Sequence, residues 1–264
     1  MPKLSTGLTI AAWMILAFLL LPSIVIIPTA FSDSVFLSFP PTGFSLRWFE
    51  AFFTSDEWLA AASRSFRIAV AVSLCATALA TFTVILLTKC SPAVSKIARA
   101  VFMAPMTLPV IVYAIAVYGL YAKLRLVGTD VGIILAHILL AFPFPFITVS
   151  AAMATMDQSL VKAGASCGAN PMRVFWWITF PLIRPGIAAG ALFAFLTSFD
   201  EVVVSMFIGG VEPTLPKRML DNIRYELSPI LAAIATLLTC LTAVSIIAAN
   251  KKRLGSARDQ NDVK

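Results

Sequence analysis

Long apolar stretches separated by polar segments dominate the pattern along the chain. A helix that crosses a bilayer needs about 20 consecutive apolar residues, because a rise of about 1.5 Å per residue must cover about 30 Å of hydrocarbon. Six stretches fit this requirement and predict membrane-spanning helices at residues 8–27, 68–87, 100–121, 132–156, 186–208 and 229–249. The expected fold class is therefore an all-α membrane protein.

The first span carries no charge and ends at Pro28, and Pro22 is a candidate kink within it. A cleaved signal peptide is the alternative interpretation. The length of the run, the single early basic residue Lys3 and the lack of an A-x-A site after the run all disfavour it. We expect this helix to stay in the mature protein.

Prolines mark two later spans. Pro105 and Pro109 in the third span predict an irregular, packed helix, and the fourth span carries Pro143 and Pro145 next to His137, the one histidine of the chain. Because no second histidine or cysteine lies nearby at ligand spacing, we expect His137 to have a packing role and expect no metal site.

Two long segments are too polar to span a membrane. Residues 32–64 form a polar and aromatic loop whose aromatic side chains suit an interfacial helix on the bilayer surface. Residues 157–184 mix polar residues with Phe175, Trp176 and Trp177, which predicts that another protein docks on this segment.

Composition excludes a soluble protein and favours a defined membrane orientation. Apolar residues make up 59% of the 264 residues and charged residues 12%. The net charge of +7 does not indicate nucleic-acid binding, because the basic residues lie in the connections between spans. With six spans both termini share one side, and the positive-inside rule predicts that this side is the cytoplasm. That side holds twelve of the twenty basic residues: Lys3, Lys89, Lys96, Arg99, Lys162, Arg173, Arg184, Lys251, Lys252, Arg253, Arg258 and Lys264. The four cysteines are expected to be unpaired thiols.

The segment from Lys162 to Pro181, KAGASCGANPMRVFWWITFP, resembles the E-A-A-x-x-x-G-x(9)-I-x-L-P signature of ABC importer permeases. Ala163, Gly168, Ile178 and Pro181 match in register, and a phenylalanine stands at the Leu position. The resemblance implies a type I importer permease fold in which this loop inserts into a groove on an ATPase subunit. The residues that we expect to couple the two proteins are Lys162, Ala163, Gly164, Gly168, Pro171, Phe175, Ile178 and Pro181.

Local chemistry favours a helix–turn–helix in this segment. The small-residue run at 163–166 permits close backbone approach, Gly168 can take a positive φ that ends a helix, and Asn170 with Pro171 can begin the next one. The alternative interpretation is an amphipathic helix that lies on the membrane.

The segment departs from the signature at two positions. Lys162 replaces the usual Glu and Gly164 replaces the second Ala, so the family's acidic contact with a basic residue of the ATPase cannot form. Either the ATPase carries a compensating acid or the partner permease takes over the contact. If Lys162→Glu left assembly with the ATPase unchanged, the compensating-acid hypothesis would be excluded.

The stretch SFDEVVVSMF, from Ser198 to Phe207, resembles the corresponding stretch of spermidine and putrescine permeases, and the similarity in span order covers nearly the whole chain. It implies a polyamine substrate, although permeases for aminoethylphosphonate or opines share such a stretch. A buried, unpaired charge at the bilayer centre costs about 2.5 kcal/mol or more, so Asp200 and Glu201 must each face a cavity or a partner. One carboxylate could meet a cationic substrate while the other contacts the neighbouring permease; alternatively both are structural ties between subunits.

The resemblance also implies the assembly: a homologous permease as heterodimer partner, two cytoplasmic ATPase subunits and a periplasmic binding protein, in the bacterial inner membrane. The chain has no G-x-x-x-x-G-K-[ST] motif, so ATP and Mg belong to the ATPase, and we expect no cofactor on this chain. The H-E-x-x-H motif is absent, and the one G-x-S-x-G match, GASCG at residues 164–168, lies in the expected helix–turn–helix rather than at a strand-to-helix turn, which disfavours a membrane enzyme. A membrane scaffold is the other non-transport alternative. We expect one permease domain at 1–250, with the coupling loop at 157–184, and a short cytoplasmic basic tail at 251–264.

Overall fold

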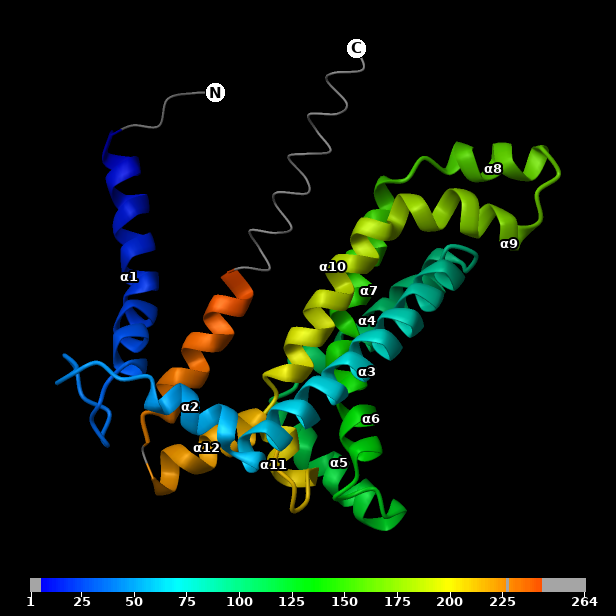
Figure 1. The fold of residues 1–264 in the computed structure, drawn as a ribbon. Helices are drawn as coiled ribbons and strands as arrows, with labels where there is room; N and C mark the ends of the chain where they lie inside the picture. The colour runs from blue at the N-terminus through cyan, green and yellow to red at the C-terminus, as the bar shows by residue number, and fades with distance from the viewer. Residues whose placement is uncertain (1–5, 227, 244–264) are drawn as a thin grey trace. The chain divides into compact units, whose positions relative to one another are not determined.

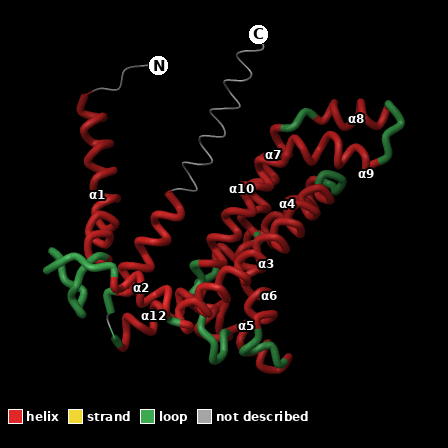
Figure 2. The backbone as a smooth tube through the Cα atoms, in the orientation of Figure 1, coloured by secondary structure: helices red, strands yellow, loops and turns green. Residues whose placement is uncertain are grey.

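The computed structural model describes residues 6–226 and 228–243, and the basic tail and the end of the sixth predicted span lie outside this range. Helices make up most of the described chain, and a long loop at residues 31–46 joins the first two of them (Figure 2). The elements are α1 (Thr6–Ala30), α2 (Arg47–Thr54), α3 (Asp56–Leu87), α4 (Pro92–Met103), the 3₁₀ turn η1 (Ala104–Thr107), α5 (Val110–Leu124), α6 (Asp130–Ala141), α7 (Pro143–Thr155), α8 (Gln158–Ser166), α9 (Pro171–Val174), the π-helical turn η2 (Phe175–Thr179), α10 (Phe180–Phe199), α11 (Val203–Ile208) and α12 (Leu215–Tyr225). A further apolar helix follows at Ile230–Ala243.

The chain divides into two compact units, one of residues 1–59 and 219–264 and the other of residues 60–218. In the first unit, α1 is a continuous apolar helix that runs through Pro22 and Pro28 and ends two residues beyond that second proline. Its side chains are exposed along most of its length, as expected for a helix surrounded by lipid. A short helix, α2, forms within the segment for which an interfacial helix is predicted. Trp48 donates from Nε1 to the Ser34 carbonyl at 3.2 Å, and the Arg47 guanidinium lies 4.5 Å from the Trp48 ring centre.

Helix α3 is longer than the sequence predicts. It begins at Asp56 rather than near residue 68, because two acidic residues in its first turn suit the positive end of the helix dipole and an alanine-rich run follows. The predicted loop therefore ends at Ser55, and Arg64 lies in a helix.

The third predicted span is not one helix. After α4 and η1 the chain bends by 101° into α5. Pro105 and Pro109 supply no backbone N–H, and Leu108, which precedes Pro109, is extended with φ −86° and ψ 136°. The fourth predicted span bends less, by 42°, between α6 and α7 at Pro143.

By length and composition, three of the described helices can cross a membrane, at residues 7–30, 56–87 and 171–199. The number of spans rises to at most five if each of the two bent pairs counts as one span. The helix at Ile230–Ala243 is shorter than a full span within the described residues. The prediction of six spans therefore stays a prediction, whereas the multi-pass helical architecture is confirmed.

Two glycines bring α10 into direct contact with α7. A Cβ built on Gly190 would lie 2.6 Å from the Pro145 Cα, and one built on Gly186 would lie 2.8 Å from the Thr148 carbonyl oxygen. The two glycines are four residues apart, which is the spacing that lets membrane helices approach closely. The prediction of the spans rested on hydrophobic runs and did not use this G-x-x-x-G pattern.

We predict that Gly190→Ala destabilises the protein, since its methyl group would overlap the Pro145 backbone and ring and the Thr148 hydroxyl. The midpoint of thermal unfolding of the purified complex in detergent should fall by several degrees. Gly119→Ala in α5 is the matched control, because nothing lies within 4 Å of its Cβ position, and it should leave the midpoint unchanged or slightly raised. Equal effects of the two substitutions would contradict the close α7–α10 contact.

Candidate functional site

The predicted helix–turn–helix forms as α8, a turn and α9. Gly168 has φ +80°, and the turn is closed by two hydrogen bonds, from the Ala169 N–H to the Gly164 carbonyl at 3.2 Å and from the Gly168 N–H to the Ala165 carbonyl at 3.0 Å. This is a Schellman motif, in which a left-handed residue satisfies the last carbonyl groups of a helix. The predicted role of Gly168 in ending the helix is confirmed.

Each arm of the turn begins with a side-chain cap. Asn170 Oδ1 accepts the Arg173 N–H at 2.8 Å with Pro171 in the first helical position, as the sequence predicted. Asp157 Oδ1 accepts the Ser159 N–H at 2.8 Å and caps α8. Hydrogen bonds from the backbone and the side chain of Ser159 hold the pKa of the Asp157 carboxyl below its ordinary value.

The helix α8 packs closely against the segment that follows Asn170, and it does so at Gly164, within the small-residue run for which close approach is predicted. A Cβ on Gly164 would lie 2.5 Å from Ile178 Cδ1 and 3.5 Å from Val174 Cγ2, so these residues meet. Because the nearest atom is the end of a flexible side chain, the usual Ala fits here after a small shift of Ile178. The departure at position 164 is therefore sterically minor, and Lys162 and Ala163 are exposed on α8.

The coupling loop was expected to end at residue 184, before the fifth span, but the helix that begins at Pro171 continues past this position. Residues 171–199 form one 29-residue helix, α9–η2–α10, which passes through a π-helical turn at Phe175–Thr179. Phe175, Trp176 and Phe180 contact one another there, with ring centres 5.1 to 6.0 Å apart. Trp177 is 82% exposed. We call residues 157–181 the hairpin from here on; Figure 1 shows it at one end of its unit.

The acidic pair lies at the other end of this helix, and here the sequence prediction was wrong. The fifth span was expected to continue to Ile208 with both carboxylates inside it, but α10 ends at Phe199, and Asp200 and Glu201 lie in a break before α11. A break at two adjacent acidic residues keeps both out of the helix interior.

The two carboxylates differ in their contacts. Glu201 is half-buried, and its Oε1 accepts the N–H groups of Val203 and Val204 at 2.7 and 3.0 Å, so it caps the start of α11. Asp200 is exposed, and within the described residues its carboxylate makes no hydrogen bond or ion pair. The Glu201 carboxylate is thus engaged by backbone N–H groups at the start of α11, whereas the Asp200 carboxylate is available to a cation.

His137 supports the end of α10. It is buried in α6, and its Nδ1 lies 2.9 Å from Ser198 Oγ, two residues before Asp200. His137 is packed inside the protein as predicted, but the expectation that its polar atoms are all satisfied is wrong, because its Nε2 has no hydrogen-bond partner in the part of the chain that the structure describes. No group of three metal-ligating side chains occurs among the residues placed by the structure.

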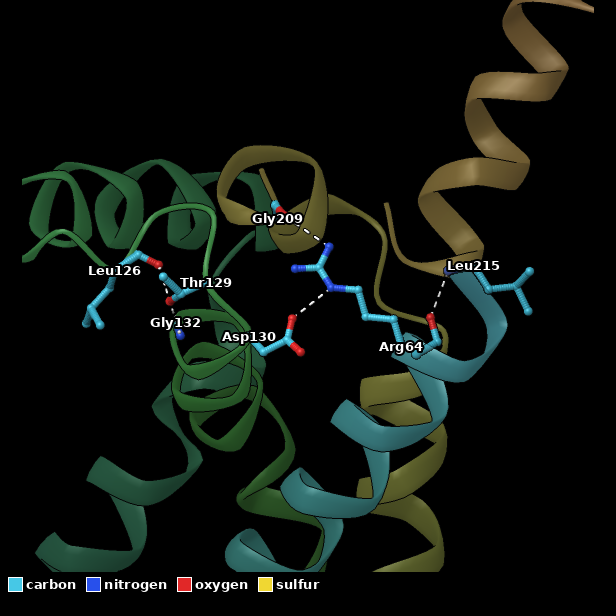
Figure 3. A network of polar contacts seen from close by, with 8 residues as sticks. Arg64, Leu126, Thr129, Asp130, Gly132, Gly209 and Leu215 are labelled. Carbon is cyan, nitrogen blue, oxygen red and sulfur yellow. Dashed lines mark hydrogen bonds and ion pairs between the residues drawn. The ribbon is translucent and has the colours of Figure 1, made fainter. Parts of the chain in front are cut away.

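A buried arginine joins α3 to the start of α6 and to the exit of α11, and no motif in the sequence predicts it. Arg64 Nε lies 2.7 Å from Asp130 Oδ1 at the start of α6, and its Nη1 donates to the Gly209 carbonyl after α11 at 3.2 Å (Figure 3). The neighbouring Ser65 Oγ accepts the Leu215 N–H at 2.8 Å. One turn of α3 therefore holds both α6 and the exit of α11.

The same end is tightened by direct backbone contact. The Gly128 N–H donates to the Ile208 carbonyl at 2.8 Å, and a Cβ on Gly210 would lie 2.6 Å from the Gly128 Cα. Thr129 Oγ1 accepts the Gly132 N–H at 3.0 Å and so caps α6 (Figure 3). Residues 128 and 210 both have positive φ, which explains glycine at each.

The family follows from a match over most of the chain. Residues 85–254 match the model of the family described as "Binding-protein-dependent transport system inner membrane component". The chain belongs to this family. It is thus a permease component of ABC importers, with the hairpin and the acidic break at opposite ends of one long helix.

Individual relatives agree with this assignment. The spermidine/putrescine transport system permease protein PotC of Escherichia coli strain K12 is 31% identical over 242 residues, which cover 89% of each chain. The putrescine transport system permease protein PotI of the same strain is 28% identical over 87% of this chain and 84% of that protein.

Solved structures agree on the fold. A bacterial ABC transporter involved in the import of the acidic polysaccharide alginate matches with a TM-score of 0.71, 15% identity and coverage of 95% of this chain and 99% of that one. The MetNI methionine ABC transporter matches with a TM-score of 0.55 and 18% identity over 76% of this chain and 97% of that one. At these identities the two matches bear on the fold alone.

We predict that removing Asp130 costs more stability than removing its buried partner. Asp130→Asn leaves the Arg64 charge, 5% exposed, without its counterion, which costs about 3–5 kcal/mol. Arg64→Met instead leaves a carboxylate that is 42% exposed and can be hydrated, so its cost should be smaller. The double substitution should be more stable than Asp130→Asn alone. Thermal unfolding of the three variants in detergent checks this order, and a double variant less stable than Asp130→Asn would contradict it.

Proposed function

We propose that this chain is the permease subunit of an ATP-driven importer that carries polyamines, such as spermidine or putrescine, across the bacterial inner membrane. Two observations support the substrate class: the relatives named for spermidine and putrescine transport, and the exposed carboxylate of Asp200 at the end of the helix at residues 171–199. A carboxylate without a partner in the described chain suits an ammonium group, because charge-assisted hydrogen bonds are stronger than neutral ones.

The structure refines the predicted roles of the two acidic residues. Glu201 caps α11, so we assign it to holding the break in shape, whereas we assign the substrate contact to Asp200. The family's architecture implies that specificity is shared with the binding protein, which delivers substrate from the periplasm. In this proposal Asp200 forms part of the permeation path rather than a high-affinity site.

The proposed assembly contains a homologous permease, two copies of a cytoplasmic ATPase that bind ATP and Mg, and a periplasmic binding protein. The hairpin docks on the ATPase through α8 and the start of α9, with Lys162, Ala163 and Pro171 on its exposed surface. In this proposal both termini are cytoplasmic, the hairpin that meets the ATPase is cytoplasmic as well, and the acidic break at the other end of its helix lies toward the periplasm. This chain holds no cofactor of its own.

Movement of the ATPase dimer reaches the permeation path along one helix. Because residues 171–199 are continuous, a displacement of α9 moves the end of α10 and the break with it. The Gly186–Gly190 contact carries α7 along, and the permease pair alternates between outward and inward openings.

The proposal is tested by ATP hydrolysis of the reconstituted complex with its binding protein, across polyamines, aminoethylphosphonate and opines. Polyamines alone should stimulate hydrolysis. Asp200→Asn should raise the polyamine concentration for half-maximal stimulation about tenfold, which corresponds to about 1.4 kcal/mol.

Two variants separate substrate contact from structure and from net charge. Glu201→Gln weakens a backbone cap, so it should lower the unfolding midpoint with a smaller effect on the polyamine dependence. Glu212→Gln removes one exposed negative charge elsewhere in the same unit and should change neither quantity. Stimulation by another compound only would refute the polyamine assignment and leave the permease function intact.

A further inference from the structure

A groove lies between α4 and α7. Its volume is about 380 Å³, within the range of small-molecule sites. Arg99 and Met103 line it from α4, and Phe146, Ile147 and Ser150 line it from α7, with small alanines beside them. Arg99 is the one ionisable side chain among its lining residues.

The floor of the groove is rigid. Phe146 is 2% exposed, and its ring packs against the rings of Phe102 and Phe142 at centre distances of 5.6 and 5.9 Å. The aromatic cluster fixes the floor, so the hollow is part of the packed bundle.

Two polar groups in the groove have no partner in the described chain. Ser150 is only 9% exposed, and its hydroxyl makes no hydrogen bond within the described residues. The oxygen is itself buried, so it reaches a ligand in the groove only after a rotation about χ1. A buried hydroxyl without a partner costs free energy, so a ligand that offers an acceptor would favour this rotation. The guanidinium of Arg99 is exposed and forms no ion pair among the residues that the structure places.

The depth of these groups matches the upper part of one leaflet. Helix α7 ends at Thr155 beside the hairpin, and Ser150 lies five residues before this end, or about 7.5 Å along the axis, with Phe146 about 13.5 Å along it. One leaflet contributes about 15 Å of hydrocarbon. Polar contacts near the surface and an apolar wall below follow the order of phosphate, ester and acyl chain in a phospholipid.

We propose that this groove binds one anionic phospholipid of the cytoplasmic leaflet. Arg99 contacts the headgroup phosphate, Ser150 donates to an ester carbonyl, and an acyl chain lies along Met103, Phe146 and Ile147. Basic pockets between membrane helices on the cytoplasmic side are suited to anionic headgroups. A cationic substrate is disfavoured here, because the groove offers it an arginine and no carboxylate. The inference depends on the proposed cytoplasmic position of the hairpin and is independent of the substrate.

Native mass spectrometry of the intact complex tests this site. With added phosphatidylglycerol, the complex should retain one lipid about tenfold more tightly than phosphatidylcholine with the same acyl chains. Arg99→Gln should remove most of this preference. Lys96→Gln is the matched control: the residue is exposed, lies three positions earlier on α4 and does not line the groove, so the preference should remain. Equal losses in both variants, or no preference in the natural protein, would overturn the proposal.

A second pair of variants tests the acyl-chain wall. Ala151→Phe fills the groove and should weaken binding of both lipids, whereas Ala78→Phe, on an exposed position of α3 outside the groove, should not. The accessibility of Ala151→Cys to a thiol reagent is then compared before and after assembly of the complex in the absence of phospholipid. If assembly alone made this cysteine inaccessible, another subunit would cover the groove and the lipid site would be wrong. Polyamine-stimulated hydrolysis should persist in Arg99→Gln, so failure of this site is distinguishable from failure of the transport function.

Discussion

The helix at residues 171–199 is the element on which the rest of this unit depends. A bilayer offers no water to unpaired backbone groups, so a segment that crosses it must satisfy its hydrogen bonds internally. Here that requirement produces one helix that begins after the Asn170 cap and ends at Phe199. The chain leaves helical geometry at the two ends of this helix, in the turn of the hairpin at one and in the acidic break at the other.

Each end is held by contacts suited to its position. At the hairpin the contacts are local, with a Schellman turn and two side-chain caps that each join residues close in sequence. Beyond the acidic break, at the exit of α11, they are long-range, because Arg64 joins α3 to segments 66 and 145 residues away. Local contacts suit a segment that docks on another protein, whereas the long-range clamp makes the far end of the bundle behave as one piece.

The features that were predictable from sequence are those set by composition or by short-range rules. The presence of several apolar membrane helices followed from hydrophobic runs, although their bounds did not, and the turn at Gly168 and the cap at Asn170 followed from residue types at fixed spacing. Three features depended on tertiary structure instead. The 101° bend after η1 needed the surroundings of Pro105 and Pro109, the end of α10 needed the cap formed by Glu201, and the burial of Arg64 needed a partner 66 residues away. One missed feature had a usable signal, since Gly186 and Gly190 show the spacing of a close helix contact.

In the proposed coupling mechanism, residues 171–199 transmit movement as a rigid rod from the hairpin to the acidic break. Spin labels at Met172→Cys and Leu196→Cys, both at exposed positions, would measure this in the assembled complex after replacement of the four free cysteines. Their backbones should lie about 36 Å apart. A rigid rod keeps the same distance with and without ATP bound. A change of about 5 Å or more, one helical turn, would show that the π-helical turn acts as a hinge and would contradict rigid transmission.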